Sequence, residues 1–123
     1  TSTDDYILFS HHMMFNLNCS GAQGIDAYLI MKAGSASIGS GDTRLNYSGT
    51  HAHYLGNNFD FYDNVSKTFV MPCTGLSVGT TYYVEQAGAT HNSLGNTIFN
   101  SRPSGYTPDR GVSNVNLIHY KKN

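Results

Sequence analysis

The chain has 123 residues, a formal net charge of −1 and a charged fraction of only 12%. This length suits one domain around one core, so we expect residues 1–123 to form a single domain. The low and balanced charge excludes a basic nucleic-acid surface, because four of the seven Lys and Arg residues lie near the C-terminus and are too few for a phosphate-binding groove. No apolar run approaches the roughly 20 residues that span a bilayer, so no membrane insertion is expected.

The beginning of the chain carries no targeting signal. It starts at Thr1 rather than Met and has no signal-peptide pattern. We therefore expect that the chain begins inside a longer protein or after processing. Its abundant Gly, Ser, Thr and Asn do not indicate disorder, because Phe, Tyr, Val, Ile and Leu recur in spaced runs.

Alternation of apolar and polar residues with a period of two dominates the chain from its beginning to its end. Met13, Phe15 and Leu17 point one way, while the residues between them point the other. Val115 and Leu117 repeat the pattern near the C-terminus. No window offers a helical stripe. The predicted strands are 5–9, 12–18, 26–33, 43–47, 51–55, 58–63, 66–71, 80–87, 96–100 and 112–120.

Turn-forming residues separate these strands at the spacing of an all-β sandwich or barrel. Examples are 34–42, 63–66, 72–79 and 88–95. Because some short strands will merge, we expect eight or nine, the number in a double Greek-key jelly roll. The predicted fold is therefore an all-β, antiparallel jelly-roll sandwich.

The two cysteines allow two interpretations. Cys19 and Cys73 each close an apolar run just before a Gly-containing turn. Strands distant in sequence can be adjacent in a sandwich, so a bridge between them is one reading. The other is two free, buried cysteines that act as small hydrophobic residues, since two cysteines do not make a disulfide framework.

The histidines offer one candidate metal site. His51 and His53 form an HAH triplet whose imidazoles project from one face of a strand, about 6.5–7 Å apart. Two imidazoles hold a transition metal only if further ligands join them, and no Cys or carboxylate is spaced nearby to help. The alternative is two exposed polar residues on a strand edge. His91 and His119 are expected at the surface or in an interface.

Catalytic motifs are missing. The chain has no GxSxG elbow, no phosphate-binding glycine loop and no local Cys–His signature. Its only glutamate is Glu85, and the seven aspartates, Asp60 among them, suit solvated turns better than the paired carboxylates of a glycosidase. We therefore expect that the protein is not an enzyme.

The loop 101–111 is the best candidate for surface recognition. It reads SRPSGYTPDRG, and its two prolines restrict the backbone. Tyr106 offers a flat ring with a hydroxyl, while Arg102, Asp109 and Arg110 can hydrogen-bond to sugar hydroxyls or pair across a subunit boundary. The alternative is an ordered connecting loop whose Arg–Asp contacts only hold its shape.

The order of features in the last third of the chain carries a resemblance. A TTY-V strand is followed by a short G-N-T-apolar run with Asn and Arg, then by a Gly/Tyr/Arg loop and a final alternating strand. The matching residues are Thr80, Thr81, Tyr82, Val84, Gly95, Asn96, Thr97, Ile98, Asn100, Arg102, Arg110, Gly111, Val115 and Leu117. In this order the chain resembles the C-terminal jelly-roll domains of phage tail fibres and other phage virion-surface proteins, which are trimeric heads similar to those of TNF and C1q.

This resemblance implies a homotrimer at the virion surface, in which three copies bury one apolar flank around a threefold axis. It implies attachment to a host surface glycan or to other virion proteins. It also implies that a transition metal on the trimer axis would take six nitrogens from three copies of His51 and His53.

Three functions follow as expectations. The first is a trimeric module at a fibre tip that attaches to the host cell surface. The second is a capsid decoration or cement protein that stabilises the phage head. The third is a non-viral lectin or C1q-like interaction domain.

Overall fold

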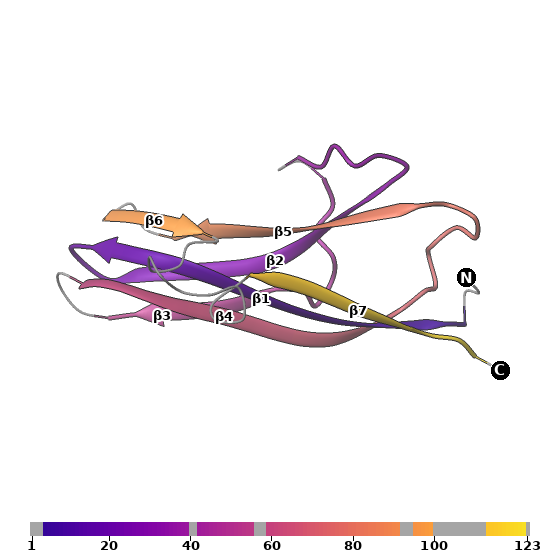
Figure 1. The fold of residues 1–123 in the computed structure, drawn as a ribbon, viewed down its shortest axis with the longest axis horizontal. Helices are drawn as coiled ribbons and strands as arrows, with labels where there is room; N and C mark the ends of the chain where they lie inside the picture. The colour runs from indigo at the N-terminus through magenta and orange to yellow at the C-terminus, as the bar shows by residue number, and fades with distance from the viewer. Residues whose placement is uncertain (1–3, 40–41, 56–58, 92–94, 100–112, 123) are drawn as a thin grey trace.

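The computed structural model describes residues 4–39, 42–55, 59–91, 95–99 and 113–122 (Figure 1). These residues contain strands and connecting segments but no helix. The seven strands are β1 (Tyr6–Cys19), β2 (Gln23–Ala33), β3 (Thr50–Tyr54), β4 (Phe59–Pro72), β5 (Tyr82–Thr90), β6 (Gly95–Phe99) and β7 (Asn114–Tyr120).

The first sheet, sheet A, is built around β1. The strand β4 pairs with β1 along its whole length, from Tyr6 opposite Pro72 to Cys19 opposite Phe59. The other edge of β1 is shared by two strands, since β6 pairs with residues 15–19 and β7 with residues 6–12. In Figure 1, β6 and β7 accordingly follow each other along the length of β1.

The second sheet, sheet B, has the order β3–β2–β5. Every strand pair in both sheets is antiparallel. The chain passes between the sheets on leaving β1, β3, β4 and β5, so most strands that follow each other in sequence lie in different sheets. The all-β, antiparallel sandwich of jelly-roll type that the sequence predicts is confirmed.

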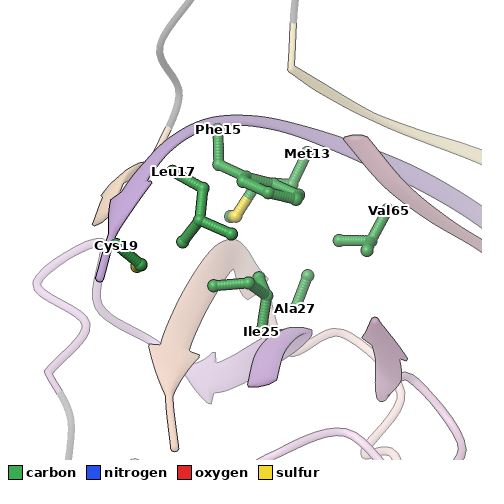
Figure 2. Packing of buried hydrophobic residues seen from close by; sticks show 7 residues of the cluster. All are labelled: Met13, Phe15, Leu17, Cys19, Ile25, Ala27 and Val65. Carbon is green, nitrogen blue, oxygen red and sulfur yellow. The ribbon is translucent and has the colours of Figure 1, made fainter. Parts of the chain in front are cut away.

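The core lies between the sheets and forms two clusters. Figure 2 shows the first, in which Met13, Phe15 and Leu17 of β1 extend toward Ile25 and Ala27 of β2. The second cluster combines Phe9, Leu29, Leu45 and Phe69, and the rings of Phe9 and Phe69 stack with centroids 5.3 Å apart. Alternate residues of β1 and β2 build these clusters because successive side chains of a strand point to opposite faces.

Three boundary predictions need correction. The strands expected at 5–9 and 12–18 merge into β1, and those at 58–63 and 66–71 merge into β4, so the turn expected at 63–66 is strand. The predicted start of the turn at 88–95 is also too early, because β5 continues to Thr90.

The strand predicted at 43–47 is also wrong. Only Arg44 forms a bridge, to Ile30 of β2. Tyr47 has a φ of 63°, which an extended strand does not allow, and the Ser48 amide donates back to the Leu45 carbonyl at 3.2 Å. The segment is therefore a turn whose Leu45 side chain closes the second core cluster.

The cysteines are free and buried, so the disulfide reading is wrong. Cys19 ends β1, whereas Cys73 follows Pro72, the residue paired with Tyr6 at the other end of β1. Thirteen residue steps of strand separate them, about 40 Å, which is far beyond the reach of a disulfide. Burial raises the pKa of both thiols, which makes them unreactive.

Candidate functional site

A polar cluster lies on the outer face of sheet B. Ile25, Ala27 and Leu29 of β2 point into the core, so Gly24 and Asp26 face outward. On the β3 side, Asp26 is paired with His51. On the β5 side, the amide of His91, the residue after that strand, donates to the Gly24 carbonyl at 3.0 Å. Residues from three parts of the chain thus converge on one spot.

Asp26 joins the two histidines. His51 Nδ1 donates to Asp26 Oδ1 and His91 Nε2 donates to Asp26 Oδ2, each at 2.6 Å. The two imidazole rings meet edge to face with centroids 5.2 Å apart. The side chains of His51 and His91 are 48% and 54% exposed, and that of Asp26 is 26% exposed. The cluster is therefore accessible from solvent while its carboxylate is held from both sides.

The carboxyl of Asp26 is kept ionised by its neighbours. Partial burial alone would raise its pKa, but the hydrogen bonds from His51 and His91 and the charges on these imidazoles outweigh that effect, so the pKa is lowered. Near neutral pH the site presents a carboxylate between two imidazoles.

A glycine forms the floor of the cluster. A Cβ atom on Gly24 would lie 3.0 Å from His51 Cε1 and 3.2 Å from His91 Cδ2. Gly24 is itself buried beneath the rings. With any larger residue there, both imidazoles would have to shift by a few tenths of an ångström.

A shallow hollow of about 200 Å³ adjoins the cluster, and Asp26 and His51 form part of its wall. The guanidinium of Arg44 lies 3.6 Å from the centre of the Tyr28 ring, and both residues also line the hollow. The outer face of sheet B therefore combines a cation, an aromatic ring and hydrogen-bonding groups beside the Asp–His cluster.

The predicted metal residues are placed as follows. His51 and His53 do project from one face of β3, with ring centroids 6.0 Å apart. The expectation that no carboxylate helps them is wrong for His51, because sheet pairing brings Asp26 against it. His91, expected to be only a surface or interface residue, completes the cluster. Their placement on a trimer axis stays a prediction.

No pattern in the sequence links the three members of the cluster, which lie 25 and 40 residues apart. The alternation around Asp26 indicates that it faces outward, and the HAH triplet indicates the same for His51. The sequence does not indicate that β3 and β5 lie on either side of β2, and this arrangement is what brings the three residues together.

The predicted recognition residues Arg102, Tyr106, Asp109 and Arg110 lie outside the described residues. The strands on either side of this loop are described. Phe99, the last residue of β6, is paired with Phe15, and Asn114, the first residue of β7, is paired with His12. The last described residue before the loop and the first strand residue after it thus both lie beside the middle of β1.

The described carboxylates form no pair of the glycosidase kind around Asp60 or Glu85. Asp60 is on the outer face of β4 in sheet A, where it accepts a hydrogen bond from Asn16 Nδ2 at 3.2 Å. Glu85 is opposite Ile30 on the outer face of sheet B. Asp63 points to the other face of β4 and accepts a hydrogen bond from the Tyr54 hydroxyl at 2.7 Å.

Comparisons of the chain with protein-family models, with curated proteins and with solved structures find no match. Among the described residues there is no helix of the length and apolarity needed to cross a membrane.

Proposed function

We propose that this chain is a non-catalytic attachment module of a phage virion, which acts as a homotrimer at a fibre tip and binds a glycan of the host surface. The observation that carries the proposal is an exposed apolar surface at one end of sheet A. This surface, called the apolar end, consists of Tyr6, Leu8, Val70, Pro72, Ile118 and Tyr120.

Two neighbouring rows of residues build the apolar end. Leu8 of β1 is paired with Val70 of β4 on one side and with Ile118 of β7 on the other. Tyr6 is paired in the same way with Pro72 of β4 and with Tyr120 of β7. Directly paired residues present their side chains on the same face of a sheet, so the six form a contiguous surface. Four of the six residues have exposed fractions between 50% and 55%.

Polar groups border the apolar end on two sides along the strand direction. The next row along the same strands is Ser10 with Thr68 and Asn116, and Thr68 Oγ1 donates to Ser10 Oγ at 3.2 Å. At the chain end, Lys122 Nζ lies 3.4 Å from Asp4 Oδ2. An apolar surface with a polar rim is typical of a protein–protein interface.

Further copies of this chain are the partners that fit the apolar end best. A domain of this size buries a limited fraction of its surface on folding and gains stability by association. Most soluble oligomers consist of identical chains related by a closed symmetry. The threefold ring is the arrangement that the resemblance to phage virion-surface heads implies.

The polar outer face of sheet B is the surface that this arrangement leaves for attachment. Its hollow combines the Tyr28 ring with the Arg44 guanidinium and the Asp26 carboxylate. An aromatic ring with a polar tip supplies apolar contact and a hydrogen bond together, which suits a sugar ring with its hydroxyls. The loop 101–111 stays the second predicted attachment surface.

The experiment measures binding of labelled protein to an array of bacterial surface polysaccharides. A trimer binds through several weak contacts at once, so its loss should weaken binding by roughly 100-fold or more. The variant Val70→Asp/Ile118→Asp disrupts the apolar end. The control Ser66→Asp/Asn114→Asp adds the same charges to the same strands and the same face, beside His12.

We expect the parent and the control to bind, and the apolar-end variant to fold but bind much more weakly. Tyr28→Ala/Arg44→Ala and Tyr106→Ala/Arg110→Ala then locate the attachment surface. A parent that binds no polysaccharide but coats purified phage capsids would contradict attachment and favour the decoration alternative.

A further inference from the structure

We propose that Asp26, His51 and His91 bind one divalent transition-metal ion per chain on the outer face of sheet B, with zinc as the ion expected first. The Nδ1 or Nε2 atom of each histidine and a carboxylate oxygen of Asp26 all lie within 4.8 Å of one another. This inference goes beyond the proposed function and does not depend on the oligomeric state.

The donor set has the chemistry of a known class of site. Two imidazole nitrogens and one carboxylate oxygen bind zinc and other first-row divalent ions, with the remaining positions open to water or a ligand. Calcium and magnesium prefer oxygen ligands and are disfavoured by two imidazoles. The site is therefore expected to select a transition metal.

The present hydrogen bonds hold the ligands close to a coordinating arrangement. Each imidazole nitrogen is 2.6 Å from an oxygen of Asp26. Around a tetrahedral ion with bonds of about 2.0–2.1 Å, the same atoms would be roughly 3.3 Å apart. Small movements of these exposed side chains make this change, and the proton of each neutral imidazole then moves to the ring nitrogen that faces away from the metal.

The backbone below the site is fixed, which limits the cost of ordering the ligands. Asp26 is in the central strand of sheet B, paired with His51 of β3 and with Ala89 of β5. The Gly24 floor allows both rings to lie over the strand. Ligands that are already oriented lose less entropy when they bind.

Three protein ligands leave at least one position of a tetrahedral ion free. Because Asp26 and His51 also line the hollow that contains Arg44, this position lies beside a space where water or an oxygen of a bound molecule fits. The site is thus expected to be an open one rather than a closed structural site.

The alternative metal site on a trimer axis makes different predictions. It uses His51 and His53 from three copies and holds one ion per three chains. The site proposed here uses His91 and Asp26 in place of His53 and holds one ion per chain. Stoichiometry and the His53 variant therefore separate the two.

The test is isothermal titration of tag-free protein with zinc chloride in a buffer that does not chelate metals. We expect one ion per chain. At about 100 times the dissociation constant, bound zinc should raise Tm by roughly 5–10 °C. Substitution by Co²⁺ should give the visible spectrum of a nitrogen- and oxygen-ligated ion.

Two variants remove ligands and one serves as a matched control. Asp26→Asn and His91→Gln should weaken zinc binding by about tenfold or more, whereas His53→Gln, an exposed histidine on the same strand face as His51, should stay within about twofold of the parent. Thermal unfolding without zinc verifies that each variant folds.

Absence of binding and of any Tm increase up to about 1 mM zinc would overturn the proposal. So would parent-like affinity in both Asp26→Asn and His91→Gln. One ion per three chains, lost in His53→Gln, would overturn it in favour of the axial site.

Discussion

His11 is a histidine that the fold buries completely between the two core clusters. Its Nε2 atom donates to the Ser48 carbonyl at 2.7 Å, and its Nδ1 atom accepts from Gln86 Nε2 at 3.2 Å. In this arrangement the imidazole is neutral, because a protonated ring would direct its second N–H at Gln86 Nε2, which is itself a donor. From the sequence, His11 falls between the strands expected at 5–9 and 12–18, and nothing in the sequence indicates its two partners.

The pKa of His11 follows from this environment. Burial lowers it below the usual value of 6.5, the hydrogen bond to Ser48 acts in the opposite direction, and the charge of Lys67 lowers it further. The unfolded chain therefore binds a proton at a higher pH than the folded protein does. The stability due to the neutral ring is fully present above pH 6.5 and is lost as pH falls from there through the folded pKa.

We predict that the free energy of unfolding falls by up to about 1.4 kcal/mol per pH unit from this residue below pH 6.5. Urea unfolding of the parent and of His11→Gln at pH 7.5, 6.5 and 5.5 measures it. The difference in stability between them should shrink as pH falls. A constant difference for His11→Gln would contradict the prediction.

At the scale of elements, β7 is fixed to the start of β1 by Asp5. The side chain of Asp5 is 2% exposed, and it accepts hydrogen bonds from His119 Nε2 at 2.8 Å and from the Lys122 amide at 3.1 Å. The carbonyl of Asp5 also accepts from the Cys73 amide at 2.8 Å. One residue thus joins the ends of β1, β4 and β7, which is where the apolar end lies.

We predict that Asp5→Ala lowers the free energy of unfolding by about 2–4 kcal/mol, because two hydrogen bonds to a buried charge are lost. Asp4→Ala is the matched control. Asp4 is 62% exposed and pairs with Lys122 only at the surface, so its loss should cost less than about 1 kcal/mol. Chemical denaturation measures both, and amide hydrogen exchange should show faster exchange along β7 in Asp5→Ala. Equal costs for the two variants would show that Asp5 does not fix the strand.

The elements illustrate what sequence patterns can and cannot predict. Alternation identified Met13, Phe15 and Leu17 of β1 correctly as inward residues because it reflects the geometry of a strand. Turn residues misled at 63–66, where Asp63 and Asn64 continue β4 because pairing with Phe15 and Met14 outweighs their turn preference. At 43–47 the apolar Leu45 is buried, but it belongs to a turn rather than a strand.

At the scale of the whole molecule, the sequence predicts a sandwich of two sheets, but it does not predict which strands lie next to each other within each sheet. The period of two and the spacing of turns indicate two packed sheets that are connected by turns, without helices. The order β3–β2–β5 depends on contacts between residues far apart in sequence, and it alone brings Asp26, His51 and His91 together. The apolar end arises in the same way, since its rows combine β4, β1 and β7.

The two outer faces of the sandwich therefore differ in character. Sheet A ends in an apolar surface with a polar rim, while sheet B presents charged and hydrogen-bonding groups around a hollow. In the proposed function the first face joins copies of the chain and the second contacts a ligand. Self-association through the apolar end is the central claim, because it explains why the apolar side chains of Val70 and Ile118 are exposed in a single chain.

The mass of the purified protein in solution, measured by light scattering during size-exclusion chromatography, tests this claim most directly. At micromolar concentration the parent and Ser66→Asp/Asn114→Asp should have three times the chain mass of 13.4 kDa. The folded variant Val70→Asp/Ile118→Asp should have the mass of one chain. A parent that stays a monomer of 13.4 kDa, or an apolar-end variant that stays a trimer, would contradict the account.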